Sequence, residues 1–143
     1  MSAIEVRRID HVVLRVRDLA ASLRFWRDAL GCRVERSSDA LGLHQLRAGD
    51  SLIDLVPIDG PLGKLGGAAP GAGGRNVDHV ALTLARFDEA AIRAQLAAHG
   101  IPAGDAAPRY GAEGMGPSIY VEDPDGNVVE LKGPAFPNTK EAP

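Results

Sequence analysis

Apolar and polar positions change their period twice in the first part of the chain. Residues 9–17 are rich in Val, Ile and Leu, which predicts a strand. Asp18 can then cap a helix that Gly31 would end. The apolar positions of this helix recur at helical spacing: Leu19, Leu23, Trp26 and Leu30. Short strands are predicted at residues 32–37, 43–48 and 52–56, so the order is β-α-β-β-β.

The second part of the chain repeats this order. It begins with a predicted strand over residues 77–84 and a helix over residues 88–99, which Gly100 ends. A short strand over residues 101–106 and a loop over residues 109–116 are expected next. The last two strands, residues 117–122 and 127–132, form a hairpin around Asp123-Pro124-Asp125-Gly126, where Pro presets the turn and Gly closes it.

Between the two parts lies a segment dominated by Gly and Pro. Residues 59–76 contain too many of these residues for a packed element, so we expect a mobile connector there. The predicted organisation is a first βαβββ module at residues 7–58, the linker at 59–76, a second module at 77–133 and a loose tail at 134–143. The predicted fold class is α+β, with the tandem modules forming a cupped, mixed β-sheet.

The repetition extends to individual residues. Ile9-Asp10-His11-Val12-Val13-Leu14 is echoed by Val77-Asp78-His79-Val80-Ala81-Leu82, and Ser51-Leu52-Ile53-Asp54-Leu55 by Asn127-Val128-Val129-Glu130-Leu131. Because side chains alternate across a strand, each of these four strands has one apolar face, which should pack on the helices. The opposite face of each strand carries one histidine or acid: His11, Asp54, His79 and Glu130.

Two histidines and two carboxylates in equivalent positions favour a metal site assembled from two half-sites. Imidazole and carboxylate ligands suit Ni, Co, Mn, Fe and Zn. The strands must curl so that the ligands approach the ion to about 2.0–2.2 Å. Asp54 has a shorter side chain than Glu130, so it reaches the ion either directly or through water. The alternative is a merely solvated polar face, which predicts neither a metal nor a pocket.

Composition restricts the remaining possibilities. The net charge of −3 and the absence of a basic run argue against nucleic acid as a partner. No apolar run is long enough for a membrane span, and the N-terminal residues lack the apolar core of a signal peptide, so a cytoplasmic location is expected. The single cysteine, Cys32, excludes an internal disulfide and is expected to be a small buried residue.

These motifs resemble the vicinal oxygen chelate superfamily, which includes glyoxalase I, bleomycin and fosfomycin resistance proteins and extradiol dioxygenases. The resemblance covers about residues 7–133 and also rests on the helix around Phe25-Trp26 and the closing segment 121–131. It implies that His11, Asp54, His79 and Glu130 occupy the four metal-ligand positions of glyoxalase I. Asp54 departs from the Glu that bacterial glyoxalase I commonly has there.

The resemblance implies a metal-dependent lyase or isomerase whose small substrate chelates the ion through two neighbouring oxygens and reacts through an enediolate. Glu130 would be the base, and Asp54 a ligand or second proton carrier. The alternatives are an Fe(II) dioxygenase using His11, His79 and Glu130, and a non-catalytic drug-binding resistance protein. A homodimer is expected. Scattered cations could hold an anionic part of the substrate: Arg15, Arg47, Lys64, Arg75, Arg109 and Lys132.

Overall fold

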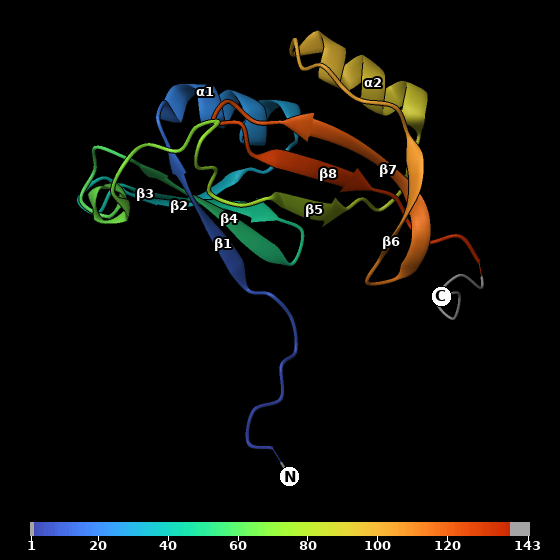
Figure 1. The fold of residues 1–143 in the computed structure, drawn as a ribbon, viewed down its shortest axis with the longest axis horizontal. Coiled ribbons are helices and arrows are strands. Elements are labelled where there is room, and N and C mark those ends of the chain that lie inside the picture. The colour runs from blue at the N-terminus through green and yellow to red at the C-terminus, as the bar shows by residue number, and fades with distance from the viewer. Residues whose placement is uncertain (1, 138–143) are drawn as a thin grey trace. The chain divides into compact units, whose positions relative to one another are not determined.

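The chain folds into two successive units of the same design (Figure 1). The computed structural model describes residues 2–137, and its two compact units, Met1–Ala69 and Pro70–Pro143, divide within the predicted connector. Each unit contains a four-stranded mixed sheet, and in each the first strand is parallel to the last. The α+β fold class and the two tandem βαβββ modules are therefore confirmed.

The first unit follows the predicted order closely. Its sheet has the strand order β1-β4-β3-β2, and its helix α1 continues into a π-helical segment, η1. Asp18 caps α1 by accepting a hydrogen bond from the amide of Ala21 at 3.0 Å, and Gly31 follows the helix with a φ of 79°. The bounds are β1 His11–Val16, α1 Leu19–Leu23, η1 Arg24–Ala29, β2 Val34–Ser38, β3 Leu43–Ala48 and β4 Ser51–Pro57.

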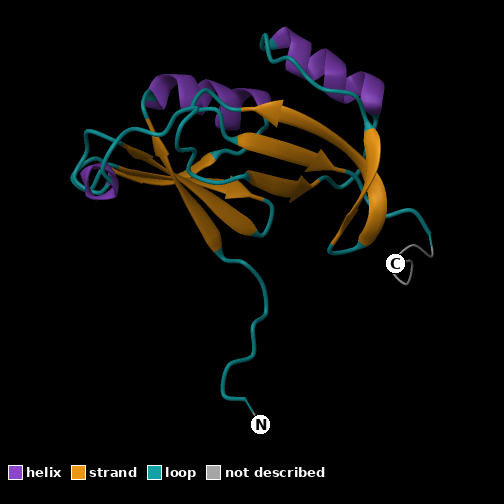
Figure 2. Cartoon of the chain, viewed as in Figure 1, coloured by secondary structure: helices purple, strands orange, loops and turns teal. Residues whose placement is uncertain are grey.

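The second unit repeats this topology with the strand order β5-β8-β7-β6 (Figure 2). Asp88 caps α2 through the amide of Ala91 at 3.0 Å, and Gly100 follows the helix with a φ of 68°. The β7–β8 hairpin confirms the predicted turn, because the amide of Gly126 donates to the carbonyl of Asp123. The bounds are β5 His79–Thr83, α2 Glu89–Ala98, β6 Ala107–Gly111, β7 Gly114–Glu122 and β8 Val128–Lys132.

Two predictions for the region after α2 are wrong. Residues 101–106 do not form a strand, because Ile101 is tied to the helix end by a hydrogen bond to the carbonyl of Leu96. Residues 109–116 form the tip of the β6–β7 hairpin instead of a loop. Its glycines make room for a neighbour: a Cβ on Gly111 would lie 2.5 Å from Cε of Lys132.

The connector is also more structured than its composition predicts. Gly63–Gly66 form a short 3₁₀ helix, η2. The guanidinium of Arg15 on β1 donates to three connector carbonyls, those of Gly63 at 2.9 Å, Gly67 at 2.6 Å and Ala68 at 2.8 Å. Hydrogen bonds from Arg15 to its backbone carbonyls thus hold this segment, which has few side chains that could pack.

In the first unit the core lies between the helix and the apolar face of the sheet, as the alternation predicts. α1 packs against β4, and Trp26 is fully buried. On the opposite face, Asp54, Glu130 and Lys132 are buried, whereas His11 and His79 are exposed. The fully or nearly fully buried apolar strand residues include Leu14, Val16, Leu46, Ile53, Leu55, Ile119, Val121, Val129 and Leu131.

The tail begins in contact with the second unit. The amide of Phe136 donates to the carbonyl of Met115 at 2.6 Å, while residues 138–143 of the predicted loose tail lie outside the described residues. Among residues 2–137, no helix has the length and apolar character needed to cross a membrane.

Cys32 is buried, as predicted, and burial raises the pKa of its thiol to about 11. At pH 7.5 the native thiol is therefore almost entirely protonated, and the thiolate is the reactive form. We expect iodoacetamide to modify Cys32 far more slowly in the folded protein than in urea, as followed by intact-mass spectrometry. Equal rates in the two conditions would contradict this assignment.

Candidate metal centre

The second unit brings His79 and Glu130 together on the face of the sheet opposite the apolar core. Glu130 lies on β8 and is paired with Ala81 of β5. Ala81 is two residues after His79, so His79 and Glu130 lie on the same face of the sheet. Only 6% of Glu130 is exposed. Oε1 accepts a hydrogen bond from Oγ of Ser118 at 2.6 Å, and Oε2 lies 3.6 Å from Nε2 of His79. One carboxylate oxygen is thus fixed, and the other is directed toward the imidazole.

The first unit presents the equivalent pair, His11 and Asp54. Asp54 lies on β4 opposite Val13 of β1, and its charge contributes to raising the pKa of His11. Nε2 of Gln45 donates to Oδ2 of Asp54 at 3.1 Å. Oδ1 of Asp54 is fully buried and has no hydrogen-bond partner within the described residues. A buried carboxylate oxygen left without a donor is costly unless a cation or a water meets it.

Both histidines are oriented by the aspartate that precedes them. Nδ1 of His11 lies 2.7 Å from Oδ2 of Asp10, and Nδ1 of His79 lies 2.7 Å from Oδ2 of Asp78. These hydrogen bonds are the largest cause of the lowered pKa of both aspartates and of the raised pKa of His11. An ionised carboxylate can only accept, so Nδ1 carries a proton, and in the neutral imidazole Nε2 keeps its lone pair.

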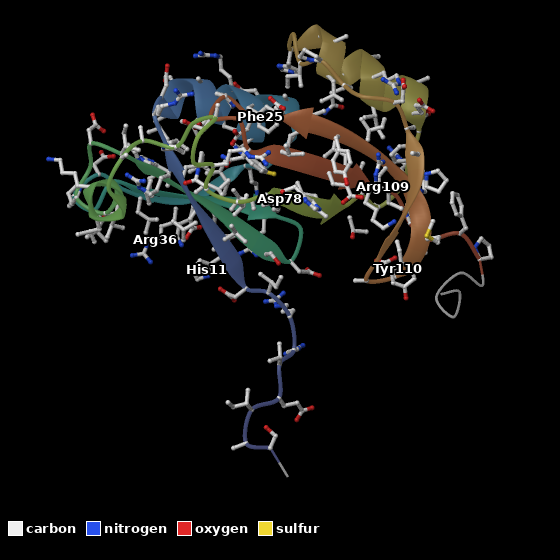
Figure 3. All side chains as sticks on the ribbon, in the orientation of Figure 1. His11, Phe25, Arg36, Asp78, Arg109 and Tyr110 are labelled. Atoms are coloured by element: carbon white, nitrogen blue, oxygen red, sulfur yellow. The ribbon has the colours of Figure 1, made fainter. Side chains whose placement is uncertain are left out.

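The donor atoms of each pair are of the kind that divalent metal ions bind. Together they consist of two imidazole Nε2 atoms and two carboxylates, one of which has a buried oxygen without a partner. Each pair lies in its own compact unit, and no three His, Cys, Asp or Glu side chains gather closely enough to hold an ion among residues 2–137. Figure 3 labels His11 in the first unit and Asp78, the neighbour of His79, in the second.

The aspartate–histidine pairs lead to a prediction about metal affinity. Asp78→Asn keeps the size of the side chain but removes the charge that fixes the tautomer of His79. Loss of such an orienting carboxylate typically weakens metal affinity by about 10–100-fold. Competition with a chromophoric chelator should show this loss, while Asp59→Asn, an exposed change in the connector, should leave affinity unchanged. Full affinity in Asp78→Asn would remove the orienting role.

Several residues of this face were not predicted from the sequence. Asp10 and Asp78 carried a signal, because the Asp-His pair occurs in both repeats. Nothing in the sequence indicated a role for Gln45, Ser118 or Tyr120. Only the strand register places them beside the acids. The ring of Tyr120, opposite Glu130, also meets the ring of His79 edge to face at 5.8 Å.

Comparison with known proteins identifies the family of this chain. The sequence profile of the Glyoxalase/Bleomycin resistance protein/Dioxygenase superfamily matches residues 8–131. The chain belongs to this superfamily. Its members typically use a divalent metal, bind small molecules and often dimerise. The donor set found in the two repeats agrees with that general property of the superfamily.

Individual relatives differ in what their names describe. The chain is 32% identical to metapyrocatechase 2 of Cupriavidus necator over 139 residues, which is 96% of this chain but only 37% of the relative. It is 28% identical to virulence protein STM3117 of Salmonella typhimurium over 88% of this chain and 83% of that protein. The crystal structure of STM3117 is similar to this structure, with a TM-score of 0.68 and 25% identity. The match covers 92% of this chain and 100% of the STM3117 chain.

A third similarity concerns the fold alone. The fosfomycin resistance protein FosX from Mesorhizobium loti superposes with a TM-score of 0.64, at 20% identity, over 92% of this chain and 96% of that one. The superfamily's name itself covers both resistance proteins and dioxygenases. The particular chemistry of this member must therefore be argued from its own residues.

Proposed function

We propose that the protein is a divalent-metal-dependent enzyme whose small substrate chelates the ion through two neighbouring oxygens. His11, Asp54, His79 and Glu130 would be the ligands, contributed as two half-sites. The observation that carries this proposal is the buried Oδ1 of Asp54, which has no partner among the described residues. A bound cation would offset the cost of burying that oxygen.

The favoured reaction is an isomerisation of the glyoxalase I type. A bound divalent ion would supply Lewis-acid stabilisation of negative charge on the substrate oxygens. Glu130 would remove the proton from the carbon next to a carbonyl and return it to the adjacent carbon. Ser118 holds Oε1 of Glu130, which leaves Oε2 as the atom that takes and gives the proton. Asp54 would serve as a ligand or a second proton carrier.

A second candidate is a ring-cleaving dioxygenase that uses His11, His79 and Glu130 with Fe(II). The similarity to metapyrocatechase 2 favours it, although the chain spans only 37% of that relative. Two histidines and one carboxylate form the facial arrangement typical of non-haem iron oxygenases. In this case Asp54 would not bind the ion directly.

The deciding experiment is elemental analysis of the purified protein, followed by metal titrations. The metal-free protein would be reconstituted with Ni, Co, Mn, Zn or Fe(II). It would then be assayed with the hemithioacetal of methylglyoxal and glutathione, and with catechols. Isomerase activity with Ni or Co is expected. Oxygen uptake with Fe(II) and a catechol would instead establish the second candidate. Binding of no metal at all would leave a ligand-binding protein without catalysis.

The assembly belongs to the same proposal. We expect a homodimer, with the half-sites combining within one chain or between two. Sedimentation with and without the bound ion tests this, because an ion shared between chains should tighten the dimer.

A further inference from the structure

The polar face of the second unit carries a cation whose hydrogen-bonding capacity is only partly used. Arg109 lies on β6, opposite Gly116 of β7, and its guanidinium carbon lies 4.2 Å from the centre of the Tyr120 ring. Nη1 makes only long bonds, to the carbonyls of Ser118 at 3.2 Å and Ala107 at 3.4 Å. Within the described residues, Nε and Nη2 have no acceptor and no carboxylate pairs with the group.

Of the other cations that could bind an anionic substrate, four have hydrogen-bond or ion-pair partners and one lies in the connector. Arg15 is occupied by three connector carbonyls, and Nζ of Lys132 is buried against the carbonyls of Arg109 and Gly116. Arg47 pairs with Glu35 at 2.6 Å, and Arg75 lies 3.6 Å from Asp78. Lys64 lies exposed on η2 in the connector. Arg109 therefore combines an unused donor edge with a place near the metal ligands.

Its position relative to the candidate metal centre follows from Tyr120. One Tyr120 ring contacts both the guanidinium of Arg109 and the imidazole of His79, and Tyr120 is paired with Glu130 across the sheet. A substrate held at His79 and Glu130 would thus extend over the tyrosine toward Arg109. Figure 3 labels Arg109 beside β7.

We infer that Arg109, stacked on Tyr120, binds an anionic oxygen group of the substrate, at the end remote from the two chelating oxygens. The free Nε–Nη2 edge matches a carboxylate, which accepts two parallel hydrogen bonds from such an edge. The aromatic ring holds the guanidinium plane in place by cation–π attraction. The inference rests on the proposed function and narrows it to small substrates with a negatively charged end.

The first test uses two hydroxamates, which chelate a metal through neighbouring oxygens. The monohydroxamate of succinic acid carries a carboxylate tail, and the matched compound carries a carboxamide instead. Calorimetry on the Co-loaded protein should show about tenfold tighter binding of the carboxylate compound, as expected for one added charge-assisted contact. Arg109→Gln should abolish the difference and leave the carboxamide affinity unchanged. Arg24→Gln, an exposed change on η1, should alter neither.

Tyr120 supplies a second matched pair of variants. Tyr120→Phe keeps the aromatic platform and should retain the preference for the carboxylate compound. Tyr120→Leu removes the ring and should reduce that preference while Arg109 is still present. Equal behaviour of the two variants would contradict the role of the ring.

A metal-free experiment separates this inference from the proposed function. In ¹⁵N-labelled apo protein, the Nε–Hε resonance of Arg109, assigned by its loss in Arg109→Gln, should move with added acetate and not with acetamide. If neither hydroxamate binds the Co-loaded protein, the proposed chelation of the substrate by the ion fails, and the acetate response alone decides the role of Arg109. An unmoved resonance overturns the anion subsite. So does a carboxylate preference that is absent, or that persists in Arg109→Gln.

Discussion

Glu130→Gln is expected to abolish nearly all turnover while leaving the fold intact. The amide cannot accept the substrate proton, and loss of a general base typically costs about 10²–10⁴ in rate. Metal affinity should also fall, because a charged ligand becomes neutral. The side-chain oxygen of glutamine can still accept the hydrogen bond from Ser118, which is 2.6 Å from Oε1 in the native protein. Hence only the charge and the proton acceptor are lost.

Three measurements separate these effects. In the metal-free state, the thermal unfolding midpoint of Glu130→Gln should be at least as high as that of the wild type, because a carboxylate that is only 6% exposed no longer has to be desolvated. Chelator competition should show the weaker metal affinity, and assays at saturating metal should show the loss of turnover. Ser118→Ala serves as a control that disturbs the position of Glu130 and keeps its charge. Turnover equal to wild type in Glu130→Gln would remove Glu130 from the mechanism.

His79→Ala should have the largest effect on metal content. Nε2 of His79 lies beside the carboxylate of Glu130, and its Nδ1 is held by Asp78. Removing a ligand itself should exceed the effect of removing an orienting residue, so metal affinity should fall by at least about 100-fold. His11→Ala should behave alike, because His11 occupies the same position in the first repeat.

His44→Ala is the matched control for both histidine variants. His44 lies on β3, where its Nδ1 is 3.1 Å from Oγ of Ser37, and it is not among the proposed ligands. Metal content measured by mass spectrometry after dialysis should fall in His11→Ala and His79→Ala and stay at the wild-type value in His44→Ala. Equal losses in all three variants would indicate a general destabilisation instead of a specific site.

The wrong loop prediction and the underestimated order of the connector share one physical cause. Glycines at residues 111, 114 and 116 indicate a loop by composition, yet residues 107–122 form a hairpin. A side chain on Gly111 would collide with that of Lys132, and one on Gly116 would collide with the backbone carbonyls of Gly133 and Pro134. Likewise, the connector is held through its carbonyls by Arg15, a contact that composition cannot reveal. Glycine occurs both where a distant part of the chain approaches the backbone closely and where a loop is flexible, so its presence does not distinguish the two.

The sequence by itself determined the βαβββ repeat, the helix caps at Asp18 and Asp88, and the strand face that carries His11, Asp54, His79 and Glu130. These follow from local periodicity and from the match between the repeats. Tertiary structure decided which side chains surround each acid: Gln45 beside Asp54, and Ser118 and Tyr120 beside Glu130, with Arg109 stacked on Tyr120. Such contacts join strands through register and burial, which depend on residues far apart in the chain.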